Sequence, residues 1–440
     1  MSKLEVDKID PQSGTDLELG TSGDTITIPA GVTFDSSAAT NTLPSTVVTT
    51  TGTQTLTNKN IVASQLTGTV ATSNLGTGTA DATTFLRGDQ TFASATPADN
   101  SITTAQLAYN PNAFRNIVIN GDMNIAQRGT SSTGITGSGY YTIDRFNTVN
   151  TTLGTWTQSQ DTTVPTGQGF ATSLKMDCTT ADASPASGDR LDIQQKFEGQ
   201  NLQYLKKGTA SAESLTLSFW VYATKTGTNI VELFDNDNSR QISQAYTISS
   251  SNTWEKKTLT FAGDTSGALG NDNGSSLQVS WFLAVGSNYS SGTLNTSWNS
   301  NTNANRAVGQ VNHADSTSND WLITGVQLEA GTTASDFEFL PVDVNTTRCL
   351  RYFQKTDYNF LGFGFATATS QWLYHNVFYN TLMRAIPTAS SNSNAVTGTS
   401  NTFGLSPKTM VCNVYAQSSG SNNDIYIAGA GAILTFNSEL

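Results

Sequence analysis

Histidine and cysteine often carry chemistry in proteins, and in this sequence they are few and scattered. The two histidines, His313 and His375, lie far apart, and neither has a Cys or Ser arrangement nearby that would indicate nucleophilic catalysis. The three cysteines are Cys178, Cys349 and Cys412, and their spacing fits neither a zinc site nor a small disulfide framework. We therefore expect ordinary loop or core histidines and reduced thiols.

One acidic stretch places oxygen ligands at alternate positions, as calcium loops do. Residues 235–239 (DNDNS) make Asp235 and Asp237 the candidate ligands. A calcium loop of this kind needs Gly at its sixth position and Glu at its twelfth, where this chain has Arg240 and Tyr246. An ordinary turn is the favoured interpretation, and we predict no resident metal.

Pairs of carboxylates are the remaining candidates for catalysis. Two carboxylates about 5 to 9.5 Å apart can hydrolyse a glycosidic bond, and the pairs Asp189 with Asp192 and Asp336 with Glu338 are close in sequence. The sequence lacks the coil-length repeat of the parallel β-helices that glycan depolymerases commonly resemble. We predict no catalytic residues, no cofactor and no enzymatic activity, and a polysaccharide depolymerase is the alternative.

Aromatic side chains indicate binding rather than catalysis, and they are concentrated late in the sequence. Ten of them lie between Tyr352 and Tyr379. Aromatic rings give a large contact area at low entropic cost, and Tyr and Trp can also hydrogen-bond to a sugar. The alternative is an apolar core, here one formed between three subunits. The candidate receptor-binding residues are Trp372, Tyr374, His375, Tyr379, Tyr415 and Tyr426.

Composition and charge limit the fold class and the partners. The formal net charge of −12 argues against a surface that binds nucleic-acid phosphates. No stretch approaches the roughly 18 apolar residues of a membrane span, and the N-terminus shows no secretion signal. Charged residues make up only 13% of the chain, so Ser, Thr, Asn and Gly carry the polar surface, which favours strands and turns over long helices.

Residues 1–110 contain too little large apolar surface to fold as a lone monomer. A segment this poor in aromatic residues cannot offset its chain entropy, so it is a disordered linker or shares a core with other copies. The strand-like alternation of Ile26 with Ile28, and of Val32 with Phe34, favours a core shared around a three-fold axis. We therefore expect a homotrimer.

From about Phe114 the pattern changes to well-formed alternating strands. Two runs have apolar residues at every second position: Leu215, Leu217, Phe219 and Val221, then Leu277, Val279, Trp281 and Leu283. In a third run the apolar phase slips at Gly325, as it does at a β-bulge. Many short strands with Gly, Asn and Ser turns predict an antiparallel β-sandwich of jelly-roll type.

Several phrases in the first quarter of the sequence resemble known fibres. Two of them lie within residues 4–29, LEVDKIDPQSG and LELGTSGDTITIP, and they resemble the starts of tail-fibre proteins of marine and cyanobacterial phages. Residues 55–61 (TLTNKNI) and 82–92 (ATTFLRGDQTF) resemble phage fibre shafts. Gln90 and Phe92 stand where such shafts usually have Gly and Trp.

A second resemblance spans roughly residues 114–355. Residues 116–130 (NIVINGDMNIAQRGT) and 141–146 (YTIDRF) look like the opening of a carbohydrate-binding-module-like sandwich found in phage fibres. The phrases GQVN, ITGVQLEAG and RCLRYFQK, within 309–355, match its close, and Ala126 stands where a Trp is expected. This resemblance implies a fold and a virion setting, while sugar binding depends on the site grafted onto the fold.

Together these features predict an all-β homotrimeric fibre in four parts. The parts are a tail-attachment region at 1–40, a β-rich trimeric shaft at 41–113, a jelly-roll sandwich at 114–347 and a compact C-terminal β tip at 348–440. The resemblance implies a virion tail protein, made in the bacterial host cytoplasm, that binds phage tail proteins (adaptor, nozzle or baseplate) through its N-terminus. Its tip would recognise a host cell-surface glycan or other receptor. The third interpretation, a lectin-like bacterial adhesin, predicts a signal peptide that this N-terminus does not show.

Overall fold

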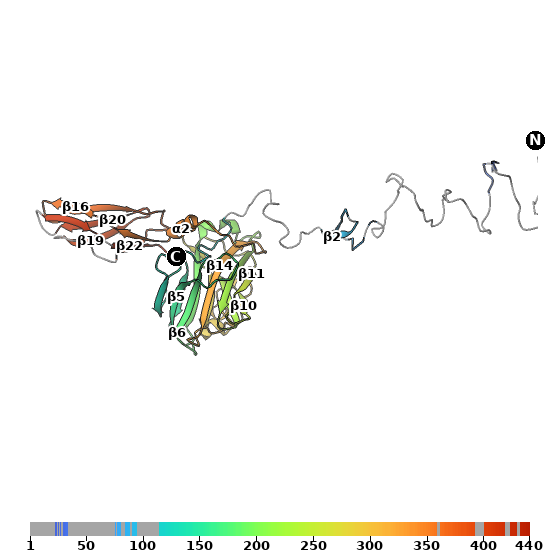
Figure 1. Ribbon diagram of the computed structural model, residues 1–440, viewed down its shortest axis with the longest axis horizontal. Helices are drawn as coiled ribbons and strands as arrows, with labels where there is room; N and C mark the ends of the chain where they lie inside the picture. Colours follow the sequence, from blue (N-terminus) through green and yellow to red (C-terminus); the bar gives the residue numbers. More distant parts are fainter. Residues whose placement is uncertain are drawn as a thin grey trace, which may run out of the picture. The chain divides into compact units, whose positions relative to one another are not determined.

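A computed structural model of the protein describes residues 114–358, 361–391, 400–418, 423–428 and 432–440, together with parts of 23–33 and 75–94. The chain divides into two compact units, Met1–Leu107 and Ala108–Leu440. Figure 1 shows the second unit as two groups of strands. In the described residues, no helix is long and apolar enough to cross a membrane.

In the first unit, the described strands form one antiparallel hairpin between β1 (Thr84–Leu86) and β2 (Phe92–Ser94). Its turn closes through the backbone N–H of Gln90, which donates to the carbonyl oxygen of Arg87 at 2.9 Å. Gln90 has φ +60°, a left-handed conformation that favours Gly. The shaft-like phrase at residues 82–92 therefore forms a hairpin. Gln90 occupies the turn position where such shafts usually have Gly, and its left-handed backbone has a conformational cost. Most of the predicted attachment region and shaft lies outside the described residues, and the trimer stays a prediction.

The predicted antiparallel β-sandwich is confirmed. The first six-stranded sheet runs, in spatial order, β13 (Asn299–Ser300), β10 (Arg240–Ile248), β9 (Gly227–Asp235), β12 (Ser275–Val285), β7 (Arg190–Glu198) and β4 (Asn147–Thr151). The second runs β11 (Glu255–Phe261), β8 (Leu215–Ala223), β14 (Asp320–Ala330), β6 (Ser173–Thr180), β5 (Thr155–Asp161) and β3 (Ser131–Ile135). Their neighbouring strands pair antiparallel. The helical segments in this region are short: η3 (Gly199–Asn201), η4 (Gln203–Leu205), α1 (Ser287–Ser290) and η5 (Asn303–Asn305).

One apolar core fills the space between the two sheets. Leu217 and Phe219 of β8 belong to the same buried cluster as Val279 and Trp281 of β12, and each of these side chains is fully buried. Burying one such side chain stabilises the fold by about 1.5 to 3 kcal/mol. The apolar residues that alternate in the sequence thus form the inner faces of both sheets, as predicted.

The predicted bulge at Gly325 is also confirmed. The pairing of β14 with β8 shifts register between Thr324 and Gln327, and Gly325 has φ +63°. A Cβ at this position would lie 2.5 Å from the ring of Phe170. Only Gly fits here, because the backbone is left-handed and the ring fills the adjacent space.

The last strands form a smaller β structure that follows helix α2 (Val342–Leu350). They pair as three antiparallel groups: β15 (Phe353–Tyr358), β22 (Ala432–Asn437) and β18 (Thr388–Ser391); β16 (Leu361–Ala366) and β21 (Asn423–Ala428); and β17 (Trp372–Phe378), β20 (Val411–Ser418) and β19 (Ser400–Pro407). Val377, Val414 and Phe436 share a small buried cluster that joins the first and third groups. Helix α2 spans the boundary predicted between residues 347 and 348 and connects the sandwich to the tip.

Candidate functional site

Three aromatic side chains lie together on the outer side of strands β17 and β20. Trp372 and Tyr374 are two residues apart, so they project from the same side of β17. Tyr415 of β20 is the direct cross-strand partner of Tyr374. Trp372 is 43% exposed and Tyr374 is 61% exposed. We call these three side chains the aromatic face.

The three rings contact one another. The ring centroids of Trp372 and Tyr374 are 6.3 Å apart with an interplanar angle of 30°. Tyr415 lies 5.3 Å from Trp372 and 6.0 Å from Tyr374. Neighbouring aromatic rings in offset or edge-on arrangements stabilise each other, and together they present a continuous apolar surface.

Amide side chains extend the aromatic face along the same two strands. Gln417 is the cross-strand partner of Trp372, and Asn376 pairs with Asn413 one row beyond Tyr374. By the two-residue period of a strand, these amides project from the same side as the three rings. Rings flanked by amide donors and acceptors suit a ligand with apolar C–H faces and many hydroxyls.

Of the other three candidate binding residues, His375 and Tyr379 do not join this surface. His375 projects from the opposite side of β17, is half-buried, and has its pKa lowered by burial. Tyr379 packs on Phe436 with ring centroids 4.7 Å apart. Tyr426 belongs to β21, but its side chain lies outside the described residues.

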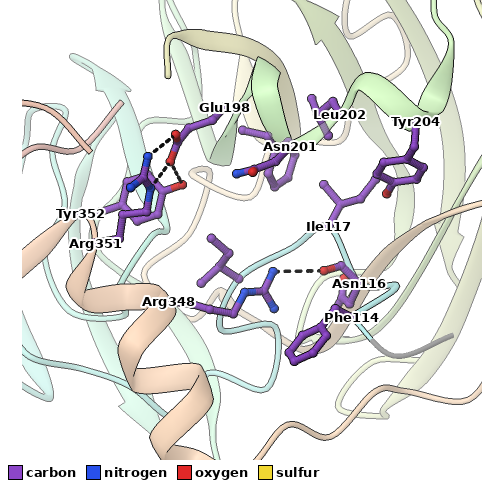
Figure 2. A pocket seen from close by; sticks show the side chains of 12 residues that line it. Phe114, Asn116, Ile117, Glu198, Asn201, Leu202, Tyr204, Arg348, Arg351 and Tyr352 are labelled. Carbon is purple, nitrogen blue, oxygen red and sulfur yellow. Dashed lines mark hydrogen bonds and ion pairs between the residues drawn. The ribbon is translucent and has the colours of Figure 1, made fainter. Parts of the chain in front are cut away.

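A separate pocket, which the sequence did not reveal, lies where α2 meets one end of the sandwich (Figure 2). It has a volume of about 310 Å³. Apolar side chains including Ile117, Ile119 and Leu202 line it, with Phe114 and Tyr204 as partly exposed rings. Its lining comes from segments far apart in sequence, so no local pattern could have predicted it.

Two arginines from the α2 region line this pocket and differ in their partners. Arg351 donates two hydrogen bonds of 2.7 Å to the carboxylate of Glu198, which also accepts one of 2.5 Å from the Tyr352 hydroxyl. Burial raises the pKa of Glu198, but the hydrogen bonds from Arg351 and Tyr352 outweigh it and lower that pKa overall. Arg348, by contrast, donates a single hydrogen bond of 3.2 Å to the backbone oxygen of Asn116. Burial lowers its pKa.

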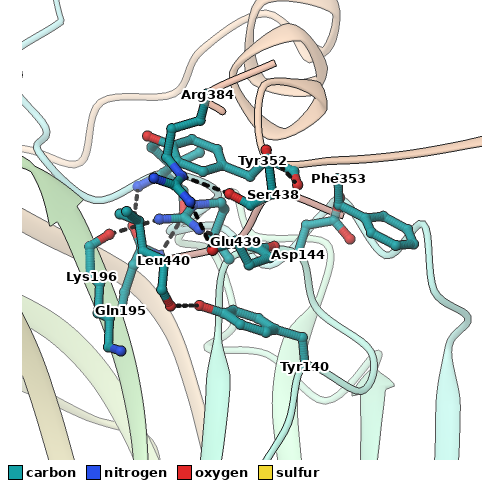
Figure 3. Close-up of polar contacts among 12 residues, drawn as sticks. Tyr140, Asp144, Gln195, Lys196, Tyr352, Phe353, Arg384, Ser438, Glu439 and Leu440 are labelled. Atoms are coloured by element: carbon teal, nitrogen blue, oxygen red, sulfur yellow. Dashed lines mark hydrogen bonds and ion pairs between the residues drawn. The ribbon is translucent and has the colours of Figure 1, made fainter. Parts of the chain in front are cut away.

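A buried polar cluster holds the tip against the sandwich (Figure 3). Glu439, beside the last strand, forms ion pairs with Arg145 and, at 3.3 Å, with Arg128. Burial disfavours the charge of Arg145, but the attraction of Glu439 outweighs this and raises its pKa. Arg145 also lies over the ring of Tyr352 at 3.5 Å. Arg384 donates to the backbone oxygen of Ser438 at 2.6 Å. The cluster therefore fixes Tyr352, and with it the end of α2.

Three of the four carboxylates considered for hydrolysis, those of Asp189, Asp192 and Glu338, hold neighbouring groups in place. Asp192 accepts two hydrogen bonds from Arg190, at 2.5 and 3.0 Å. Asp189 accepts hydrogen bonds from the backbone N–H of Ala186 at 2.8 Å and from Thr152 at 2.7 Å.

In the second pair, the carboxylate of Glu338 has such a role. The carboxylate of Glu338 accepts hydrogen bonds from the backbone N–H groups of Phe114 and Asn116. For Asp336, the hydrogen bonds from Arg115 and Gln327 go to its backbone oxygen.

The calcium candidates also hold a turn. Asp235 is fully buried and pairs with Lys207, and Asp237 accepts a hydrogen bond from the backbone N–H of Gly270 at 2.8 Å. This agrees with the ordinary turn between β9 and β10. Within the described residues, no three His, Cys, Asp or Glu side chains gather as metal ligands would.

Comparison with known proteins adds fold neighbours only. A scan against protein-family models finds no match, and a search of curated proteins finds none either. Over 49% of its length the chain is similar to the enzymatically active domain of tailspike protein 4 from bacteriophage CBA120, at 14% identity and a TM-score of 0.27, and it spans only 21% of that chain.

Two sugar-binding modules are also similar to this chain. The family 11 carbohydrate-binding module from Clostridium thermocellum, in complex with a mixed-linked tetrasaccharide, shows 9% identity and a TM-score of 0.23, covering 47% of this chain and 98% of that one. The N-terminal cellulose-binding domain of Cellulomonas fimi β-1,4-glucanase C shows 11% identity and a TM-score of 0.22, covering 48% and 100%. With identities and TM-scores this low, none of them assigns a function to this chain.

Proposed function

We propose that this protein is a phage tail fibre that recognises a host cell-surface glycan through the aromatic face of its tip. The supporting observation is a group of three mutually contacting rings with amide side chains beside them, of which Trp372 and Tyr374 are exposed and Tyr415 is half-buried. Exposed aromatic clusters are uncommon on proteins without a partner, because large apolar side chains are more stable when buried. A pyranose ring can stack its C–H face on such rings and hydrogen-bond to the amides.

The virion setting of the proposal is supported by the sequence resemblance to fibres of marine and cyanobacterial phages. In this proposal the protein is a homotrimer, residues 1–40 attach it to the phage tail, and it has no enzymatic activity. The structural use of Asp192 and Glu338 supports binding over hydrolysis, since both carboxylates accept two hydrogen bonds from neighbouring protein groups.

Host adsorption tests the binding role. Trp372→Ala and Tyr374→Ala should each weaken attachment of the purified full-length protein to host cells by about tenfold, the usual cost of truncating a central aromatic contact. Ile386→Ala is the control: Ile386 is an apolar side chain of the tip that is 66% exposed, and it lies outside strands β17 and β20. Unchanged adsorption of the Trp372 and Tyr374 variants would contradict the proposal.

The alternative is that the aromatic face forms an apolar contact between subunits of the trimer. The same variants distinguish the two roles, because loss of an intersubunit core would lower the trimer mass measured by light scattering. The proposal requires normal trimer mass with weakened adsorption. Incubation of the protein with host polysaccharide completes the test, since shortened chains would instead identify a depolymerase.

A further inference from the structure

The pocket beside α2 contains polar groups without protein partners. A guanidinium has five N–H donors, and among the described residues Arg348 uses one of them, toward Asn116. The side-chain amide of Asn201 and the hydroxyl of Tyr204 have no hydrogen-bond partner in that part of the chain either. Burial raises the pKa of Tyr204 to about 12, so its hydroxyl stays a neutral donor and acceptor. Figure 2 shows Asn201 and Tyr204 on the opposite side of the pocket from Arg348.

One of the two arginines that line the pocket forms no ion pair among the described residues. Glu198 and Arg351 neutralise each other through two short hydrogen bonds. Arg348 forms no ion pair among the described residues: the carboxylate of Glu338 attracts its charge, but that carboxylate accepts its hydrogen bonds from the backbone of Phe114 and Asn116. A partly desolvated guanidinium is stabilised by an anion, and a carboxylate matches its fork geometry with two parallel hydrogen bonds.

The walls and size of the pocket restrict which kind of ligand can carry the anionic group. Its volume of about 310 Å³ is at the lower end of the range for ligand pockets. The apolar wall contributed by Ile117 and Leu202 suits C–H groups, and the rings of Phe114 and Tyr204 suit the flat face of a sugar. Asn201 and Tyr204 lie across from Arg348, where hydroxyl groups of the same ligand would meet them.

We propose that this pocket binds a single acidic sugar residue, with the sugar carboxylate on Arg348 and its hydroxyls on Asn201 and Tyr204. The site is separate from the aromatic face, and it stands whether or not that face binds the host receptor. An acidic peptide is the other carrier of a carboxylate, but it lacks the cluster of hydroxyls that Asn201 and Tyr204 would pair with.

Titration of the full-length protein with glucuronic acid, followed by calorimetry or ligand-observed NMR, tests the proposal. We expect saturable binding of glucuronic acid and binding weaker by about tenfold or more for glucose, which lacks the carboxylate. Arg348→Gln should weaken binding of the acid by a similar factor. Arg87→Gln, the same change at an exposed arginine of the first unit, should leave it unchanged.

A second variant keeps the test decisive if Arg348→Gln fails to fold. Asn201→Trp leaves Arg348 in place and fills the exposed side of the pocket, so it should also abolish binding. The proposal is overturned if Arg348→Gln or Asn201→Trp binds the acid like the unmodified protein, or if glucose binds equally well. Equal binding of a short acidic peptide would overturn the sugar assignment, and no binding of glucuronic acid would overturn the site. Trp372→Ala should leave this binding unchanged, which separates it from the role proposed for the tip.

Discussion

The buried histidine of the sandwich should make the fold sensitive to acid. The side chain of His313 is fully buried, and its Nε2 lies 2.7 Å from Oδ1 of Asn229. Because that oxygen can only accept, Nε2 carries the proton, and Nδ1 has no partner among the described residues. Burial, reinforced by the charge of Lys225 and opposed by Asp315, lowers the pKa of His313 from 6.5 to about 4.

The size of the effect follows from the two pKa values. As the pH falls below 6.5, the unfolded chain binds a proton at this histidine while the folded chain does not, so acid favours unfolding. Each unit of difference between the two pKa values changes the unfolding free energy by about 1.36 kcal/mol. The difference between 6.5 and about 4 therefore lowers the unfolding free energy in acid by about 3 kcal/mol. This stability is present above pH 6.5, is lost as the pH falls toward about 4, and changes little below that value.

Chemical denaturation across this pH range, followed through the buried Trp281 and Trp321, measures the effect. His313→Gln is the informative variant, because its amide N–H can still donate to Asn229 and does not titrate. We expect the unfolding free energies of the unmodified protein and this variant to diverge by about 3 kcal/mol over the interval. His375→Gln, a change in the tip, should leave the pH dependence of the sandwich intact. Parallel curves for the unmodified protein and His313→Gln would refute the reasoning. So would an NMR signal of the His313 imidazole, identified by its loss in His313→Gln, that titrates near 6.5 in the folded state.

Four further changes have defined outcomes. Gly325→Ala should lower the unfolding free energy by about 2 to 4 kcal/mol, because the new methyl group meets the Phe170 ring and the backbone is left-handed there. Gly137→Ala is the control in the same denaturation assay and should be nearly neutral, because the space around Gly137 is open. Gln90→Gly should stabilise the hairpin of the first unit by about 1 kcal/mol, seen as slower amide exchange in its strands. Glu439→Gln should lower the unfolding free energy by about 3 to 5 kcal/mol, because the buried guanidinium of Arg145 loses its partner. Faster hydrogen exchange at residues 438–440 would report this loss. The three cysteines are unpaired and buried with raised pKa values, so no thiol should react with a thiol reagent before the protein unfolds. Rapid modification of one thiol per folded chain would contradict this.

The sandwich could be predicted because its signals are local. The alternation of Leu217 with Phe219, and of Val279 with Trp281, is a property of single strands, and each strand needs only one buried face to produce it. The phase slip at Gly325 marked the bulge for the same reason. The helix that joins sandwich and tip was not predicted, because α2 has only nine residues, of which Asn345 and Cys349 are buried, and this is too short for a clear helical period.

The aromatic face was only partly predictable. Trp372 and Tyr374 share a side because they are two residues apart, but Tyr415 joins them through cross-strand register, which depends on pairing between distant segments. Tyr379 follows the end of β17 and packs inward on Phe436, on the same side as Val377, where the two-residue period of the strand would place it. The pocket around Arg348 had no sequence signal, since the segments that line it meet only after folding.

The net charge of the protein constrains how an acidic glycan would bind. With a net charge of −12 the chain repels a polyanion at long range, but salt screens this beyond about 10 Å at 0.1 M ionic strength. The guanidinium of Arg348 acts at contact distance inside the pocket, where screening is weak. Rising salt should therefore strengthen or leave unchanged the binding of an acidic polysaccharide, unlike the weakening seen on basic surfaces. If three copies assemble as proposed, the repeated sites add avidity without any new contact, so shallow sites for single sugars suffice for attachment to a repetitive cell surface.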